Sequence, residues 1–261
     1  MASLNASSGS LRVSLADWIA VLEIDRPPAN YFDPPLIAAI ADAATELQAR
    51  RDCRVIVFCS AGKHFCAGAD FGSEALQDDR EHMAGLLYDQ GARLFEIELP
   101  VVAAVQGAAV GGGLGLACAA DFRVASAGTR FQANFPALGF HHGFGLSVTL
   151  PRIVGEQKAL DLLLTGRRVA GTEAFTLGLA DRLAEAGAER DGAMELARSL
   201  AVAAPLAVQS IKQTQRGRLA GEVRQALKRE LAEQTRLWRT RDSREGIAAG
   251  LARTTPQFTG E

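Results

Sequence analysis

Two glycine-rich turns carry the residues of this sequence that could do chemistry. The first is SAGKHFCAGADF at residues 60–71, and the second is the glycine run 111–113 inside QGAAVGGGLGLACAADFRVA at residues 106–125. Glycine adopts backbone angles that other residues avoid, and it lets another molecule approach the main chain closely. The glycine run precedes a small-residue helix, whose free N–H groups and positive dipole end attract negative charge. Such a turn could hold a phosphate, or an oxygen that becomes negative during a reaction.

The absence of nucleotide-binding fingerprints favours a site for an oxygen that becomes negative during a reaction over a phosphate site. The pattern GxxxxGK[ST] does not occur, and no GxGxxG with a suitably placed acid fits. Each turn follows an apolar run that predicts a strand, so in a parallel sheet both turns would lie at the carboxyl ends of strands, where active sites gather. Two backbone N–H groups converging there would form an oxyanion hole. One glycine turn alone is more often a tight connection between strand and helix.

The elements that must position these turns alternate between strands and helices. This alternation predicts an α/β fold with a mainly parallel sheet and helices packed outside it. The apolar runs and proline or glycine breaks predict strands at residues 11–15, 19–24, 55–59, 101–105, 122–125 and 130–132. Helical spacing predicts helices at residues 34–50, 73–98, 146–154, 157–164 and 171–177, and four more between residues 191 and 251. We expect a disordered tail at 1–10, an α/β core at 11–200 and a helical C-terminal region at 201–261.

Composition excludes several classes of function. Lysine and arginine number 28 and acidic residues 30, so a net charge of −2 gives no electrostatic case for nucleic acid or a membrane surface. No apolar run is long enough to span a membrane, and the first ten residues lack the features of a signal peptide. The four cysteines form no CxxC pair, which argues against a metal site and suits a reducing cytosol. We expect a cytoplasmic protein.

The two turns together resemble the paired signatures of the crotonase superfamily, also called the enoyl-CoA hydratase/isomerase family. The resemblance extends over nearly the whole chain. It includes IDRPPAN at 24–30, LPRIVGEQKALDLLLTGRRV at 150–169 and REGIAAGLARTTPQFTG at 244–260. It implies a crotonase-like fold, a spiral of ββα units with a helical C-terminal trimerisation region, assembled as trimers or dimers of trimers. It also implies an acyl-CoA thioester as ligand and no separate cofactor, because coenzyme A is part of the substrate.

The resemblance also assigns the donors of an oxyanion hole. These are the N–H groups of Ala69, in CAGAD, and of Gly112, in the middle of GGG. Gly68 and Gly111 would keep the approach to these donors clear. Backbone amides suit the task because they cannot lose their proton or rotate away, and losing one donor costs about 3–4 kcal/mol of barrier.

Two carboxylates that hydratases of this family use are missing. Hydratases carry one glutamate in a GGGxE arrangement and another in a loop that reads PExxxG, where the pair positions water and moves its proton. Gly115 stands at the first position, and Phe135, in NFPALG, aligns with the second. A standard hydration of a simple enoyl-CoA is therefore not expected, nor is a one-glutamate isomerisation.

Histidines are the first candidates to replace those carboxylates. His141 and His142 precede Gly143 in a loop that faces the reacting acyl carbons in relatives, and histidine suits proton transfer near neutral pH. Each could instead line the pocket or bond to backbone. Asp70, next to Ala69, is the reserve candidate, although its place in relatives suggests a turn or cap. Weaker candidates are Glu74, Asp78, Asp79, His64 and His82.

Other residues are predicted to bind coenzyme A or the acyl group. The resemblance puts Lys63 and Ala67 beside the adenine and pantetheine, and directs Arg253 at the nucleotide phosphates. Lys212 and Arg26 are weaker candidates, and exposed basic residues are most often plain surface solvation. The residues that could give the acyl pocket an apolar lining, or could belong to the ordinary core, are Phe131, Phe135, Phe140 and Phe144.

The sequence therefore predicts an enzyme of acyl-CoA thioesters that polarises the thioester carbonyl. Its reaction could be a decarboxylation, the hydrolysis of a carbon–carbon bond or the hydration of a cyclic acyl group. A third hypothesis is a homologue that binds acyl-CoA without catalysis because both glutamates are lost.

Overall fold

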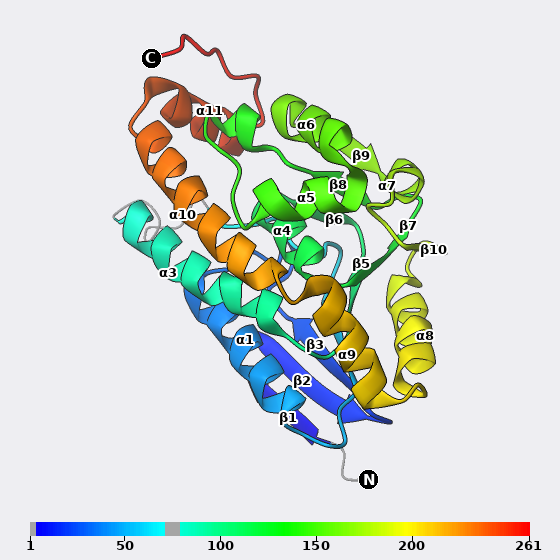
Figure 1. Cartoon of the computed structure of the whole chain (residues 1–261). Coiled ribbons are helices and arrows are strands. Elements are labelled where there is room, and N and C mark those ends of the chain that lie inside the picture. The colour runs from blue at the N-terminus through cyan, green and yellow to red at the C-terminus, as the bar shows by residue number, and fades with distance from the viewer. Residues whose placement is uncertain (1–3, 71–78) are drawn as a thin grey trace.

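The computed structural model describes residues 4–70 and 79–261 and has a mixed α/β fold (Figure 1). A seven-stranded sheet has the strand order β1-β2-β3-β4-β5-β7-β10. Its strands are β1 (Leu4–Ser8), β2 (Leu11–Ala16), β3 (Ile19–Ile24), β4 (Val55–Ser60), β5 (Val101–Val105), β7 (Phe122–Ser126) and β10 (Arg182–Ala184). The first three pair antiparallel, and every pair from β3 to β10 is parallel. The predicted mainly parallel sheet is confirmed.

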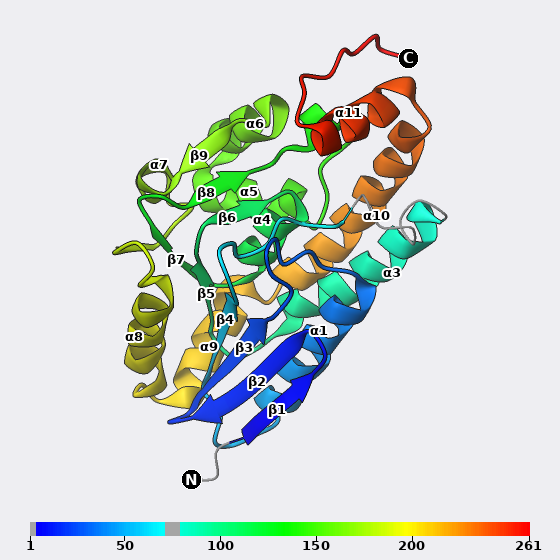
Figure 2. The ribbon, with the colours of Figure 1, turned by 180° about the vertical axis from the view of Figure 1, so that it is seen from behind.

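Helices cover both faces of this sheet, as expected for strands that are apolar on both sides. The helices are α1 (Pro34–Gln48), α3 (Arg80–Arg93), α4 (Gly112–Ala119), α5 (Leu146–Val154), α6 (Glu156–Thr165), α7 (Gly171–Leu177), α8 (Glu189–Ala201), α9 (Pro205–Arg216), α10 (Leu219–Trp238) and α11 (Arg241–Ala252). Alternate residues of β4 enter different cores: Ile56 and Phe58 join the core that includes α1, whereas Val55 and Val57 pack with α8. Figure 2 shows α8 and α1 on opposite sides of the strands.

A second, three-stranded sheet lies beyond the end of the first. It consists of β6 (Ala108–Val110), β8 (Arg130–Gln132) and β9 (Arg168–Ala170), in that order. The sequence prediction missed the three-residue strands β6, β9 and β10, although it included β8, which has the same length. A run of three residues is short for a period of two to show. The correction matters at β6, since the glycine run follows β6 directly and not the apolar run of β5.

The N-terminal segment differs from its prediction. Residues 4–8, expected to belong to a disordered tail, form β1 and pair with β2 from Leu4 opposite Leu15 to Ser8 opposite Leu11. Without this pairing β2 would be an edge strand with a row of unsatisfied N–H and C=O groups. The backbone of β1 satisfies them.

The helix expected at residues 73–98 begins and ends differently. Its first residues lie outside the described part of the chain; the described helix is α3, followed by a 3₁₀ turn at Leu94–Glu96. The other predicted helices are present, and α1 begins where Asp33 caps the N–H of Leu36, with prolines at its first positions. The final region is helical as expected, in α9, α10 and α11. The role of this region in trimer assembly stays a prediction.

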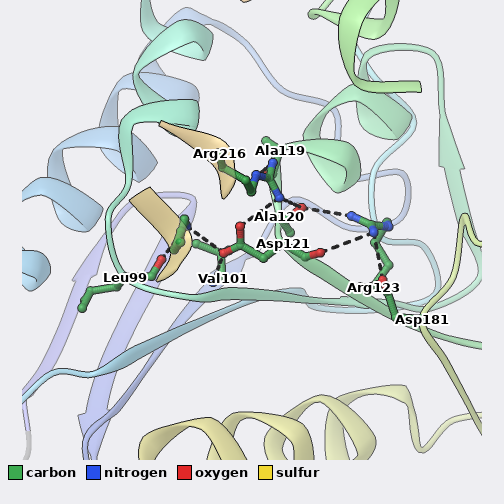
Figure 3. A network of polar contacts seen from close by, with 9 residues as sticks. Leu99, Val101, Ala119, Ala120, Asp121, Arg123, Asp181 and Arg216 are labelled. Carbon is green, nitrogen blue, oxygen red and sulfur yellow. Dashed lines mark hydrogen bonds and ion pairs between the residues drawn. The ribbon is translucent and has the colours of Figure 1, made fainter. Parts of the chain in front are cut away.

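A buried polar network anchors α9 to the sheet, although no residue of α9 is itself buried (Figure 3). Asp121 accepts from the Val101 N–H and from Lys212 Nζ, both at 2.7 Å, and pairs with Arg216 at 2.8 Å. Lys212 also donates to the Leu99 carbonyl. Its assignment as an exposed candidate for the coenzyme A phosphates is therefore wrong, because the ammonium group is committed to a buried carboxylate. In the described part of the chain, no helix is both long and apolar enough to cross a membrane.

Candidate active site

The two glycine turns lie side by side and touch through their backbones. Cys66 in the first turn pairs with β6 like a strand: its N–H donates to Ala108 O at 3.1 Å, and its carbonyl accepts from Val110 N–H at 3.0 Å. A Cβ on Gly113 would lie 2.1 Å from Cys66 O, and a Cβ on Gly68 would lie 3.2 Å from Gly112 N. Gly68 also has a φ of +87°, which favours glycine. Glycine is thus required where the turns meet.

Each turn presents one of the predicted N–H donors. Gly112 is the first residue of α4, so its N–H has no acceptor within the helix. Ala69 forms an isolated parallel bridge with Phe32, whose own N–H donates to Gly68 O at 2.9 Å. In such a bridge the partner bonds to the two neighbours of the bridged residue, which leaves the N–H of Ala69 on the opposite side. Both residues line one cavity.

This cavity has a volume of about 750 Å³, which is within the range of small-molecule sites. Its rim is polar and partly exposed, with Arg26 and Asp33 joined by a 2.8 Å ion pair. Its inner wall is mostly apolar and buried, and includes Leu87, Phe140 and Phe144. A ligand could therefore place a polar portion at the rim and an apolar group inside.

The structure brings most of the predicted site residues to this cavity. Those that line it are Ala67, Gly68, Ala69, Asp70, Gly111, Gly112, Phe135 and Gly143. Those that do not line it are Lys63, His141, His142 and Arg253. Arg26, a weaker candidate, does line it, and so do Phe140 and Phe144, whereas Phe131 is fully buried in the core. Asp79 caps α3 by accepting from His82 N–H; Glu74 and Asp78 lie outside the described residues.

The two adjacent histidines make their hydrogen bonds away from the cavity. His141 Nδ1 lies 2.7 Å from the His142 carbonyl, and His142 Nε2 lies 2.9 Å from Ser147 Oγ. The rings stack with centroids 4.0 Å apart. Burial, with the neighbouring His141 as a smaller cause, lowers the pKa of His142 to about 3, so its ring is neutral near pH 7. Neither histidine lines the cavity into which the N–H donors open, and a catalytic role for either stays a prediction.

A buried carboxylate fixes the loop that contains these histidines. Glu230 of α10 accepts from Gly145 N–H at 2.9 Å and from Ser147 N–H at 3.0 Å. These are free N–H groups at the start of α5, where negative charge is favourable. Burial raises the pKa of Glu230 above its ordinary value. The loop is thus held to α10 from one side.

Phenylalanine side chains fill the two places where the resemblance expects glutamates. A Cβ on Gly115 would lie 2.6 Å from the Cβ of Phe144, so no side chain fits at position 115 in this packing. Phe144 has a φ of +58°, unusual for a bulky residue, and its ring packs on Phe32 with centroids 5.2 Å apart. Phe135 itself occupies the second position and packs edge-on against Phe140.

Sequence reasoning missed the part of the cavity wall that comes from two helices. Tyr88 of α3 donates to Gln234 Oε1 of α10 at 2.8 Å, and both side chains line the cavity. Trp238, one turn after Gln234, lines it too. The signal was present in α10, because Glu230 and Gln234 are polar residues on its buried face. Polar residues on a buried helix face often mark a site or a fixed contact.

Cysteine and metal chemistry receive little support at this site. Cys66 is fully buried beside the first turn, and burial raises its pKa to about 12, so its thiol is protonated at neutral pH. Within residues 4–70 and 79–261, no group of three or more His, Cys, Asp or Glu side chains could hold a metal ion.

Comparison with known proteins identifies what this architecture is similar to. The family model described as enoyl-CoA hydratase/isomerase matches residues 15–261. The (E)-benzylidenesuccinyl-CoA hydratase of Thauera aromatica is 31% identical over 257 residues, 95% of this chain and 98% of that protein. The 1,2-epoxyphenylacetyl-CoA isomerase of Escherichia coli is 29% identical over 255 residues, 93% of this chain and 95% of that protein. An enoyl-CoA hydratase/isomerase structure from Pseudoalteromonas atlantica superposes with a TM-score of 0.85 at 31% identity, covering 96% of this chain and all of that one.

Proposed function

The chain belongs to the enoyl-CoA hydratase/isomerase family, and from that premise we propose that it is an enzyme of acyl-CoA thioesters. In the proposed reaction the thioester carbonyl binds at the N–H groups of Ala69 and Gly112, where an enolate-type oxyanion forms. Backbone donors keep their position while the negative charge grows, so they stabilise the oxyanion more than the neutral carbonyl. The observation that carries this proposal is that both glycine turns open into one largely apolar cavity.

The proposed reaction differs from the hydration of a simple enoyl thioester. Hydration of that kind uses two carboxylates with separated pKa values to hold water and move its proton. Gly115 and Phe135 stand at those positions, and Phe144 fills the space above Gly115. Decarboxylation, carbon–carbon hydrolysis and hydration of a cyclic acyl group are the alternatives that the same oxyanion would serve. The Thauera relative is named for a benzylidene acyl group, and the phenylalanines of this cavity would suit a ring.

Asp70 is the proton-transfer group that we propose first. It follows Ala69 directly and lines the cavity, whereas neither histidine does. A role for His141 or His142 would require the rings to leave the His142 carbonyl and Ser147. The nucleotide end of coenzyme A is proposed to lie outside the cavity, near the exposed Lys63 and Arg253, with Arg253 supplied by a neighbouring subunit of a trimer.

The experiment that tests the oxyanion proposal removes the N–H of Gly112 and compares the result with a variant of similar side-chain size that keeps it. A Cβ at position 112 would lie 2.4 Å from Cζ of Phe32, so substitutions are made in a Phe32→Leu background, which lacks that atom. Gly112→Pro removes the N–H at a first helical position, where proline is tolerated. Gly112→Ala adds the same Cβ and keeps the N–H, so it is the matched control.

Turnover is measured by mass spectrometry on straight-chain, aromatic and alicyclic acyl-CoA thioesters. We expect the proline variant to lose about 10²–10³-fold in kcat, the usual effect of one oxyanion donor. The alanine variant should keep most of the turnover of its background. Equal turnover in the two variants would show that the Gly112 N–H does not bind the oxyanion.

A second candidate function is acyl-CoA binding without catalysis. The observation that favours it is an apolar residue or a filled space at both glutamate positions. A protein of this kind would gain melting temperature from acyl-CoA by mass action while leaving every thioester of the screen unchanged. Turnover of any of these thioesters excludes it.

A further inference from the structure

The buried end of the cavity contains a polar pair that the proposed oxyanion chemistry does not use. The Tyr88 side chain of α3 and the Gln234 side chain of α10 are 7% and 3% exposed, and both line the cavity (the two helices run side by side in Figure 1). A Cβ on Gly143 would lie 1.8 Å from the Tyr88 oxygen and 2.7 Å from Gln234 Nε2. Glycine at position 143 therefore makes room for this pair.

The hydrogen bonds of the pair determine which way its protons point. Gln234 Nε2 donates to the carbonyl of His141 at 2.8 Å, and a carbonyl can only accept. The amide oxygen of Gln234 must then face Tyr88, whose hydroxyl donates to it at 2.8 Å. The only proton of the Tyr88 hydroxyl is thus committed to Gln234.

The Tyr88 oxygen consequently offers an acceptor and no donor. Burial raises the pKa of Tyr88 far above its ordinary value, so the group stays a neutral phenol and is unsuited to act as a base. A phenol oxygen has two lone pairs, so the Tyr88 oxygen can accept a hydrogen bond while its own proton is donated to Gln234. That donor would come from a molecule in the cavity.

An indole supplies the complementary group. Trp238 follows Gln234 by one helical turn and lines the same cavity. Its Nε1–H is buried and has no hydrogen-bond partner among the residues that the structure describes. A buried N–H without a partner is unfavourable, so an acceptor supplied by a ligand would stabilise the bound state.

We propose that the acyl group bound here carries a hydroxyl group remote from the thioester, which donates to the Tyr88 oxygen and accepts from the Trp238 N–H. A hydroxyl is the smallest group that can both donate and accept. The inference rests on the proposed function, because it names the class of acyl-CoA that the same cavity takes. Tyr88 and Trp238 are specificity residues under this assignment, and Gln234 positions Tyr88.

Calorimetric titration with matched pairs of thioesters tests the proposal. The pairs are 4-hydroxyphenylacetyl-CoA with phenylacetyl-CoA, and 6-hydroxyhexanoyl-CoA with hexanoyl-CoA. We expect the hydroxylated member of at least one pair to bind about tenfold tighter, the factor of one good hydrogen bond. Tyr88→Phe should reduce this preference to about one. Trp238→Phe, which removes the indole N–H donor and leaves the Tyr88 acceptor in place, should reduce it as well.

Tyr31→Phe is the control variant, because Tyr31 lines the rim of the same cavity and is 39% exposed. It should leave the preference unchanged. The inference is wrong if no pair shows a preference, or if Tyr88→Phe weakens both members of a pair equally, as a purely structural tyrosine would. Failure of every thioester to bind would instead refute the proposed function, and this inference with it.

Discussion

Replacing Gly115 by alanine tests why α4 has a glycine where the resemblance expects a glutamate. A Cβ there would lie 2.6 Å from the Cβ of Phe144 and 2.9 Å from its Cδ1. The Cβ of Phe144 is bonded to the main chain and cannot swing aside, so the backbone must shift. Overpacking costs about 1–3 kcal/mol, and a contact between two Cβ atoms puts Gly115→Ala at the upper end, about 3 kcal/mol.

Phe144→Gly is the compensating change. It removes a ring from a side chain that is only 2% exposed, and truncating a buried phenylalanine costs about 3–5 kcal/mol. Glycine adopts the φ of +58° freely, which returns about 1–2 kcal/mol of left-handed strain. The net loss in unfolding free energy should be about 1–4 kcal/mol.

The double variant shows whether the two changes are coupled. With the Phe144 side chain gone, the new methyl group meets no atom of it, and alanine in a helix is up to about 1 kcal/mol better than glycine. Gly115→Ala should therefore be neutral or stabilising in the Phe144→Gly background, a coupling of about 3 kcal/mol. Urea unfolding of the four proteins, followed by circular dichroism, measures it. Costs that add to within about 0.5 kcal/mol would refute the packing argument.

Two further predictions concern buried charge. Asp121→Asn should lower the free energy of unfolding by about 3 kcal/mol, because it leaves Lys212 and Arg216 without their carboxylate. The control is Glu222→Gln at the exposed ion pair with Arg152, which should cost under about 1 kcal/mol. Equal costs of the two variants in urea unfolding would contradict the role of the network. His142→Gln should remove a pH dependence. The folded pKa of about 3 lies below the ordinary 6.5, so the unfolded chain binds the proton first and wild-type stability falls between about pH 6.5 and 3, with no effect above. The difference between wild type and variant should grow through that window, and a constant difference would contradict it.

The parts of the fold that the sequence predicts best are those with an uninterrupted apolar period. β3 and β5 lie at the expected residues, because a buried strand of the VVAAV type has few alternatives. The three-residue strands β6, β9 and β10 are specified by partners elsewhere in the chain, as β6 is by Cys66 and β8, and no local pattern encodes them. The tail at 4–8 was mispredicted for the same reason, since its strand depends on the free edge of β2.

The same distinction applies to the candidate site, where some residues are predicted by local sequence and the orientation of others depends on distant parts of the chain. Gly68, Ala69, Gly111 and Gly112 come from two short motifs, and local sequence predicts that they lie together at one cavity. The side-chain direction of His141 and His142 depends on Ser147 and on Glu230, which is 85 residues after Gly145 in the chain. Sequence reasoning could place the histidine loop but could not orient its rings, because the orienting carboxylate belongs to α10.

The cavity is thus assembled from two sources that can vary separately. In the proposed function, the carbonyl end consists of backbone N–H groups on two glycine turns. A Cβ added at Gly113 would lie only 2.1 Å from Cys66 O, so a side chain there would disturb the fold itself. In the proposed function, the acyl end consists of side chains on α3 and α10, such as Tyr88, Gln234 and Trp238, which belong to other elements than the turns. A family that keeps its oxyanion chemistry and changes its acyl group would change this second set. The polar residues on the buried face of α10 are therefore the part of this protein most informative about its substrate.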